Sequence, residues 1–268
     1  AEHGGASSMH NIIRVLSRLP EIDATVFALY YPHNQHDYDF YGAKVYSFGY
    51  KYGINRFEKL SIWKKCSGKF YLEQELKKFD IIHSFWSGES GYLASKLSKQ
   101  YGIPLVTTVC GGETAAIPSI NYGSMLKFWQ RRFVNRTFRR ASVINALSNY
   151  AAEQINAVYK NKYAQKIKIL PFGLDEKMFS PAVNNSPSKR LINIASAVPV
   201  KAHNDLFRAF KIVLEKFPDL KLECYGRDDN NLLASLAASC GIEKNVVLNG
   251  YTKYEQLPLI LNDSLLYV

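Results

Sequence analysis

The sequence predicts an α/β protein with two domains, each built on a parallel, doubly wound sheet. Along its 268 residues, short runs rich in Val, Ile and Leu alternate with longer helix-prone stretches. The short runs lack polar–apolar alternation, as expected of strands that are buried on both faces. A polar segment at 183–189 has the composition of a linker. We expect an N-terminal domain at 1–172 and the start of a second domain at 173–268.

The first domain shows this alternation in order. A helix begins at Ser7 or Ser8, because apolar residues then recur at helical spacing until Pro20 ends the pattern. A long helix follows at 56–79, and the pattern leaves open whether it is interrupted near Gly68. Strands are expected at 25–30, 44–48, 81–85, 105–109, 142–146 and 167–170, and further helices at 91–100, 125–140 and 150–159.

The second domain repeats the same alternation after a connector. Pro171 stops the strand at 167–170, and residues 173–181 indicate a linking segment because proline and glycine punctuate them. Strands are then expected at 191–197, 221–225, 245–248 and 264–268, with helices at 203–217, 231–239 and 254–261 between them. Alternating βα units of this kind predict parallel sheets.

All of the excess positive charge lies in the first domain. Residues 1–172 hold 23 Lys and Arg against 12 Asp and Glu, whereas residues 173–268 hold 11 of each, which leaves the net charge of +11 in the first part. Arg132, Arg136, Arg139 and Arg140 recur at the spacing of one helical face. Such a face suits anionic lipid headgroups, an anionic lipid-linked acceptor or nucleic acid, or is simply solvated. The strands lack the aromatic–basic interleaving of nucleic-acid platforms, so we expect no nucleic-acid partner.

Cysteine usage and hydropathy indicate the compartment. The four cysteines are scattered without the spacing of a zinc site, which favours reduced thiols. No run approaches the ~18 apolar residues that cross a bilayer, and no secretory signal is visible. We expect a cytoplasmic protein with peripheral contact to the inner face of an anionic membrane.

Candidate site residues follow strands or precede helices. Gly4 and Gly5 come before the first helix, whose N-terminal N–H groups attract phosphate. The strand at 81–85 carries His83, and the strand at 105–109 leads into a loop at the carboxyl edge of the sheet, where ligands bind. That loop contains Cys110, Gly111, Gly112 and Glu113.

The second domain delivers a single lysine into a loop before a helix. Lys201 follows the strand at 191–197, and an ammonium group there suits a diphosphate leaving group whose negative charge grows as a bond breaks. Gly226 and Arg227 end the next strand. A surface lysine with no ligand is the plain alternative.

A connector at 171–181 followed by a loop lysine resembles the retaining two-domain (GT-B) enzymes of glycosyltransferase family 4. The resemblance runs from Gly4 to Val268 and implies two Rossmann-like domains, the second incomplete. It implies that Gly4, Gly5, Ser196, Lys201, Gly226 and Arg227 bind the donor, that Cys110 and Glu113 are catalytic, and that His83, Gly111 and Gly112 line the acceptor cleft. It implies transfer of a hexosyl unit from a nucleoside-diphosphate sugar to a saccharide or lipid-linked acceptor, with no cofactor and no metal.

The sequence departs from the family at several positions. Cys110 stands where the family usually has histidine, and Ser196 stands where it has arginine, a role that Arg227 is placed to take over. We expect a first strand ahead of Gly4 and the family's pair of donor-binding glutamates beyond Val268, so the fragment alone should be inactive.

Three other interpretations stay open. These are a nucleotide-sugar epimerase of the same fold, a non-catalytic two-lobed binding protein, and a nucleic-acid binder. The triplet from Asp37 to Asp39 matches the metal-binding motif of a different glycosyltransferase fold, but here it sits in a tyrosine-rich segment predicted to be a loop. We expect no metal site.

Overall fold

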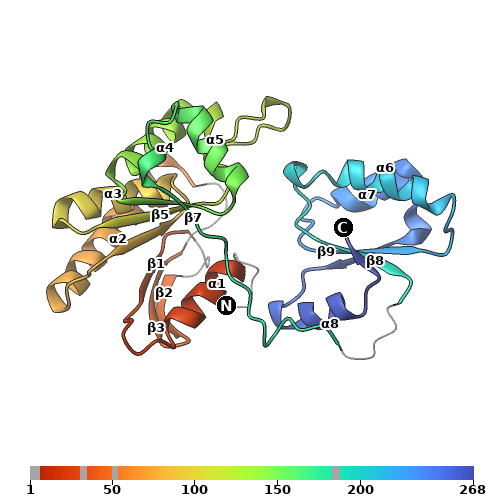
Figure 1. Cartoon of the computed structure of the whole chain (residues 1–268), viewed down its shortest axis with the longest axis horizontal. Coiled ribbons are helices and arrows are strands. Elements are labelled where there is room, and N and C mark those ends of the chain that lie inside the picture. Colours follow the sequence, from red (N-terminus) through yellow and green to blue (C-terminus); the bar gives the residue numbers. More distant parts are fainter. Residues whose placement is uncertain (1–6, 31–34, 50–53, 183–187) are drawn as a thin grey trace. The chain divides into compact units, whose positions relative to one another are not determined.

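The computed structural model describes residues 7–30, 35–49, 54–182 and 188–268. The chain divides into two compact units, one of which is Ser8–Gly173 while the other contains Leu174–Val268 (Figure 1). The boundary expected between residues 172 and 173 lies one residue from this division. The α/β fold class is confirmed, and each unit contains a fully parallel sheet.

The first unit holds two sheets. In one, β1 (Thr25–Ala28) pairs in parallel with β3 (Ala43–Phe48), and β2 (Gln35–Phe40) pairs antiparallel with β3. The other is fully parallel in the order β4 (Ile82–Phe85), β5 (Leu105–Val109), β6 (Val143–Ala146) and β7 (Ile167–Ile169). The helices are α1 (Ser7–Leu16), α2 (Arg56–Leu76), α3 (Glu89–Tyr101), α4 (Phe128–Arg140) and α5 (Asn149–Tyr159).

Two apolar clusters hold this unit together. Tyr46 of β3, Phe70 of α2 and Leu97 of α3 belong to one cluster, which therefore joins the two sheets through the helices. Val134 and Phe138 of α4 pack in the other cluster, against the four-stranded sheet, and both side chains are fully buried. Strands buried by helices in this way match the uninterrupted apolar runs of the sequence.

The second unit holds one parallel sheet whose strand order reverses. The order is β10 (Val246–Gly250), β9 (Lys221–Tyr225), β8 (Arg190–Ile194) and β11 (Leu266–Tyr267). Successive strands run outward from β8 in one direction, and β11 then lies on its other side. Helices α6 (His203–Leu214) and α7 (Leu232–Cys240) cover one face, and α8 (Leu257–Asn262) lies on the opposite side (Figure 1). Phe207 and Leu222 are fully buried between helices and sheet.

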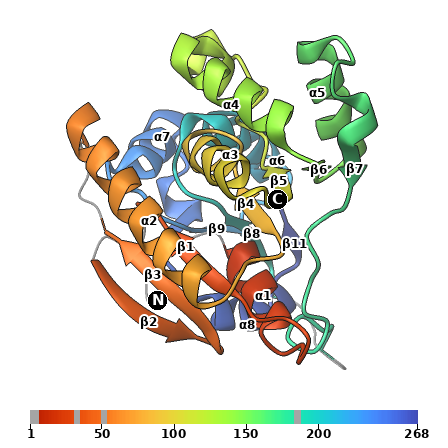
Figure 2. The ribbon, with the colours of Figure 1, turned by 90° about the vertical axis from the view of Figure 1, so that its left-hand side faces the viewer.

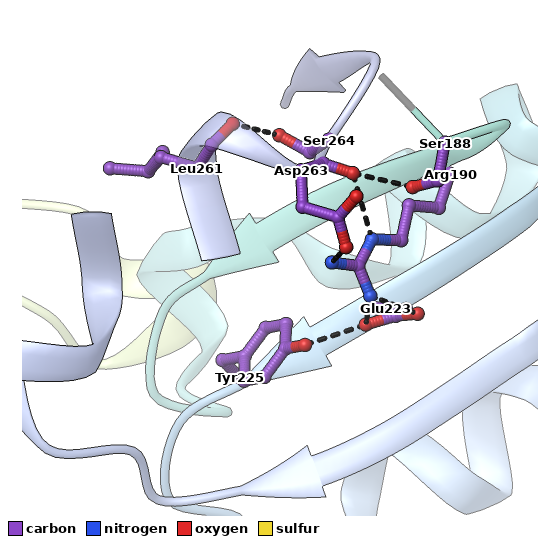
Figure 3. Close-up of polar contacts among 7 residues, drawn as sticks. All are labelled: Ser188, Arg190, Glu223, Tyr225, Leu261, Asp263 and Ser264. Atoms are coloured by element: carbon purple, nitrogen blue, oxygen red, sulfur yellow. Dashed lines mark hydrogen bonds and ion pairs between the residues drawn. The ribbon is translucent and has the colours of Figure 1, made fainter. Parts of the chain in front are cut away.

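Arg190 ties three segments of this unit together (Figure 3). Its Nη1 donates to both carboxylate oxygens of Glu223 on β9, at 3.1 and 3.2 Å. Its Nε donates to the backbone oxygen of Asp263 at 3.1 Å, and its Nη2 pairs with the Asp263 carboxylate. Tyr225 donates its hydroxyl to Glu223 at 2.6 Å. Because the guanidinium forms ion pairs with two carboxylates, it holds the segment after α8 against the first residue of β8 and against β9.

The structure corrects one sequence prediction and answers one question that the sequence left open. The segment of Asp37 and Asp39 is the strand β2, because Tyr41 and Gly42 both take positive φ (55° and 92°) and close a two-residue hairpin onto β3. Helix α2 is not interrupted, since a capping box at Asn55 and Glu58 fixes its start and it runs through Gly68 to Leu76.

Two helical glycines should respond in opposite directions to the same substitution. Gly68→Ala should stabilise the protein by roughly 0.5–1 kcal/mol, because a Cβ there meets nothing within 4 Å and alanine favours helix. Gly91→Ala should destabilise it by about 2 kcal/mol, since its Cβ would lie 2.7 Å from Thr137 Cγ2 and 2.9 Å from Trp86 O. Urea unfolding measures the change in unfolding free energy of each variant relative to wild type. Equal changes in the two variants would contradict the packing of α3 on α4.

Candidate active site

The loops after β4 and β5 are tied together by one buried carboxylate. Glu113 is 3% exposed, and its side chain accepts backbone N–H groups from Ser87 at 3.1 Å and from Cys110 at 3.2 Å. Burial raises the pKa of Glu113, and the backbone donors around it oppose that rise. The carboxylate thus shapes the carboxyl edge of the sheet at the place where the sequence predicts a ligand loop.

His83 lies on β4 and forms a polar chain across three strands. Its Nε2 lies 2.8 Å from Thr108 Oγ1, and Asn145 on β6 donates to the same hydroxyl at 3.3 Å. The ring stacks on Phe85 with centroids 4.5 Å apart. Although His83 is exposed at the edge strand, desolvation by the atoms packed around the imidazole lowers its pKa.

Cys110 begins the loop that contains Gly111 and Gly112, and its thiol is neutral. Burial raises the pKa of Cys110 to about 12, with a further contribution from Glu113. Gly111 takes φ of +113°, a conformation that side chains rarely adopt. Gly112 lies against the ring of Tyr122, since a Cβ there would be 3.1 Å from the hydroxyl. The loop is therefore well defined, and its thiol is not ionised near neutral pH.

Trp86 is a site candidate that sequence reasoning missed. It follows β4 directly, is 46% exposed, and takes φ of +62°, which is a true outlier for a bulky residue. Its backbone is held there because its N–H donates to Thr108 O at 3.0 Å. The only signal in the sequence was an aromatic residue beside the small residues Ser87 and Gly88.

In the second unit, the loop after β8 leaves the sheet where the strand order reverses. In open α/β sheets such a switch point is where ligands bind. The loop carries Ser196 and, in the short 3-10 helix Pro199–Lys201, the exposed Lys201. Ala202 takes φ of +53° and starts α6 without a side-chain cap. The first N–H groups of α6 therefore have no side-chain acceptor.

His203 supports this loop from below. It is 3% exposed, and its Nε2 lies 3.1 Å from Asn193 Oδ1 on β8, while its buried Nδ1 has no hydrogen-bond partner among the described residues. Burial lowers the pKa of His203, and the nearby Lys201 acts in the same direction while Asp228 opposes it. The buried imidazole near Lys201 is therefore neutral at neutral pH.

Gly226 and Arg227 meet the loop after β8 at close range. Gly226 takes φ of +144°, and a Cβ there would lie 2.2 Å from the backbone oxygen of Ala195. Ala197 N donates to Arg227 O at 2.8 Å, and the Arg227 side chain is exposed, 3.9 Å from Asp229. Only glycine allows the two loops to approach in this way.

The predicted site residues thus fall into two groups, one in each unit. Those in the first unit are His83, Cys110, Gly111, Gly112 and Glu113, and those in the second are Ser196, Lys201, Gly226 and Arg227. Gly4 and Gly5 lie outside the described residues. Among the residues that the structure describes, no cluster of His, Cys, Asp and Glu is arranged to hold a metal ion.

Two units, each with a parallel sheet and candidate ligand loops at its carboxyl edge, define a Rossmann-like α/β protein. The chain belongs to glycosyltransferase family 4. The model described as Glycosyltransferase Family 4 matches residues 3–177, and the model described as Glycosyl transferases group 1 matches residues 175–268. Sugar transfer is the activity of such enzymes. No curated protein matches the sequence.

Solved structures resemble this chain at low identity. Sucrose-phosphate synthase from Thermosynechococcus elongatus is 13% identical with a TM-score of 0.78, covering 100% of this chain and 71% of that one. The lipopolysaccharide outer core galactosyltransferase WaaB is 15% identical with a TM-score of 0.59, covering 100% and 71%. A UDP-N-acetylglucosamine 2-epimerase is 15% identical with a TM-score of 0.57, covering 97% and 69%. These likenesses establish the fold.

His203 should make stability depend on pH in the mildly acidic range. Its pKa is lowered on folding, so its contribution to stability is complete above the unfolded value of about 6.5 and is lost as the pH falls through the folded value. The free energy of unfolding of wild type should therefore fall toward that of His203→Gln on acidification. Urea unfolding at a series of pH values measures the difference in unfolding free energy between wild type and the variant. A difference that does not change with pH would contradict the buried neutral imidazole.

Proposed function

We propose that the protein transfers a hexosyl unit from a nucleoside-diphosphate sugar to a hydroxyl group of a saccharide or lipid-linked acceptor, with retention and without a metal ion. The observation that carries this proposal is the exposed ammonium of Lys201 at the strand-order switch point, beside the uncapped start of α6. A positive charge beside N–H groups that lack a side-chain acceptor suits a diphosphate. Arg227 supplies a second positive charge where the loops meet.

The chemistry of the described loops favours stabilisation of the leaving group. The Cys110 thiol is protonated and the Glu113 carboxylate is buried among backbone donors, so neither is a ready nucleophile. In the proposed reaction, the bond between the sugar C1 and the diphosphate breaks and the acceptor oxygen bonds to C1 on the same face. The acceptor proton leaves on the diphosphate. Lys201 stabilises the charge that develops there.

The acceptor is proposed to meet the loops of the first unit. Trp86 offers an exposed ring to the face of a sugar, and the polar chain of His83 and Thr108 offers hydrogen bonds. Such an acceptor suits polysaccharide or glycolipid assembly. An epimerase of the same fold is the second candidate, because UDP-N-acetylglucosamine 2-epimerase is among the similar structures.

Replacing the lysine should remove transfer. Lys201→Met keeps the length of the side chain but loses its charge, so kcat of the full-length protein with the preferred donor should fall about 100- to 1000-fold. UDP- and GDP-sugars are screened with saccharide acceptors, and the product anomer is read by NMR. Lys211→Met, an exposed lysine on α6, is the matched control and should keep wild-type turnover.

Three results would contradict this proposal. They are unchanged turnover of Lys201→Met, loss of transfer on addition of a chelator, and an inverted product. Conversion of the nucleotide sugar with no acceptor requirement would favour the epimerase.

Trp86 should act on the acceptor alone. Trp86→Ala should raise KM for the acceptor about tenfold and leave KM for the donor unchanged, whereas Trp86→Phe should keep most of the affinity because an aromatic ring remains. Steady-state kinetics with each substrate varied in turn measures this. A rise in the donor KM of similar size would contradict an acceptor role.

A further inference from the structure

One face of α4 combines aromatic and cationic side chains. At 100° per residue, Phe128, Trp129, Arg132, Arg136 and Arg139 fall within an arc of about 100°. The opposite side of the helix carries the buried Val134, Thr137 and Phe138, which anchor it. We call these five exposed residues the α4 face. Figure 2 shows α4 on the outside of its unit, with α3 beneath it.

This part of the chain carries only positive charge. Between Glu113 and Glu153 the sequence has six Lys and Arg and no Asp or Glu. In the described part of the chain, no ion pair joins an arginine of the α4 face to a carboxylate. Arg132 instead lies over the Phe128 ring at 5.1 Å, and Arg136 lies 6.0 Å from the centre of the Tyr92 ring. The charge of these arginines is therefore available to an external partner.

The structure separates these arginines from two basic residues that serve the fold. Arg140, which the pattern places on the same face, turns inward and donates to Ser98 O at 2.9 Å and Ile103 O at 3.4 Å. Lys166 donates to the backbone oxygens of Arg139 and Ala141, which end α4. Both residues satisfy helix C-termini. The prediction that Arg140 belongs to the exposed basic face was wrong for this reason.

The large exposed rings specify the kind of partner. Phe128 is 53% exposed and Trp129 is 66% exposed, and both lie in the first turn of α4. Arginine stems and aromatic rings together suit a surface that is anionic at the headgroups and apolar just beneath. Base stacking uses free ring faces, and Arg132 occupies one face of the Phe128 ring. These observations favour a bilayer over a nucleic acid.

We propose that the α4 face docks the protein on an anionic lipid bilayer, with Phe128 and Trp129 entering the headgroup region and the arginines binding lipid phosphates. None of the described helices is both long and apolar enough to cross a membrane. This docking does not depend on the proposed sugar transfer, and the two can fail separately.

Vesicle binding tests the proposal. The whole chain is sedimented with vesicles of phosphatidylcholine, alone or mixed with phosphatidylglycerol, and binding is expected only to the mixture. Changing Arg132, Arg136 and Arg139 together to Gln should lower the partition coefficient about 100-fold, because each cation near an anionic surface contributes about one kcal/mol. The matched control changes three exposed lysines of the same unit, Lys78, Lys96 and Lys99, to Gln and should bind as wild type does.

A second variant tests insertion of the ring. Trp129→Phe should keep binding but lose the blue shift of fluorescence that wild type shows on vesicles, because Trp63 packs against Phe133 and Trp86 follows β4, so neither belongs to the α4 face. Circular dichroism checks that every variant folds. The proposal is overturned if the arginine variant binds as wild type does, or if the lysine control loses as much affinity. It is also overturned if the blue shift survives in Trp129→Phe, or if a single-stranded oligonucleotide binds more tightly than the vesicles and depends on the same arginines.

Discussion

Parallel pairing of buried strands is the constraint on which the rest of this molecule depends. Parallel strands need a crossover connection, and here helices that cover the sheets follow β3, β4, β5, β6, β8, β9 and β10. All carboxyl ends of one sheet then lie at one edge. Cys110, Lys201 and Arg227 are far apart in sequence, yet each lies in a loop that leaves such an edge in its own unit. The direction of the strands thus determines which loops lie together at the edge where a ligand can bind.

Single polar or glycine contacts then give the edge loops their shape. In the first unit the Glu113 carboxylate gathers backbone donors from two loops, so the ends of β4 and β5 are fixed relative to each other. In the second unit Gly226 lets the loops after β8 and β9 pack closely, because a Cβ at this position would clash with Ala195 O. Such preorganised loops lower the cost of ordering a ligand site. His203 adds a buried, neutral side chain that contacts Asn193 of β8 just after Lys201 in the sequence.

The sequence predicted most elements because their signals are local. Strands 105–109 and 221–225 occur as predicted, and the connector after Pro171 holds no helix or strand. The hairpin of β2 was missed because it depends on positive φ at Tyr41, which no composition rule favours. The left-handed backbone of Trp86 and the inward turn of Arg140 depend on tertiary contacts with Thr108 and with the end of α3. Whether the family roles of Cys110 and Ser196 hold stays a prediction, since geometry alone does not assign them.

In the proposed reaction, the Lys201 ammonium holds the diphosphate of the donor. The most direct measurement is the affinity of wild type and Lys201→Met for a nucleoside diphosphate and for the matching nucleoside, by calorimetry. We expect the diphosphate to bind wild type more tightly than the nucleoside does. In the variant, this difference in affinity should shrink at least about tenfold, while the affinity for the nucleoside stays unchanged. An equal difference in both proteins would contradict this role of Lys201.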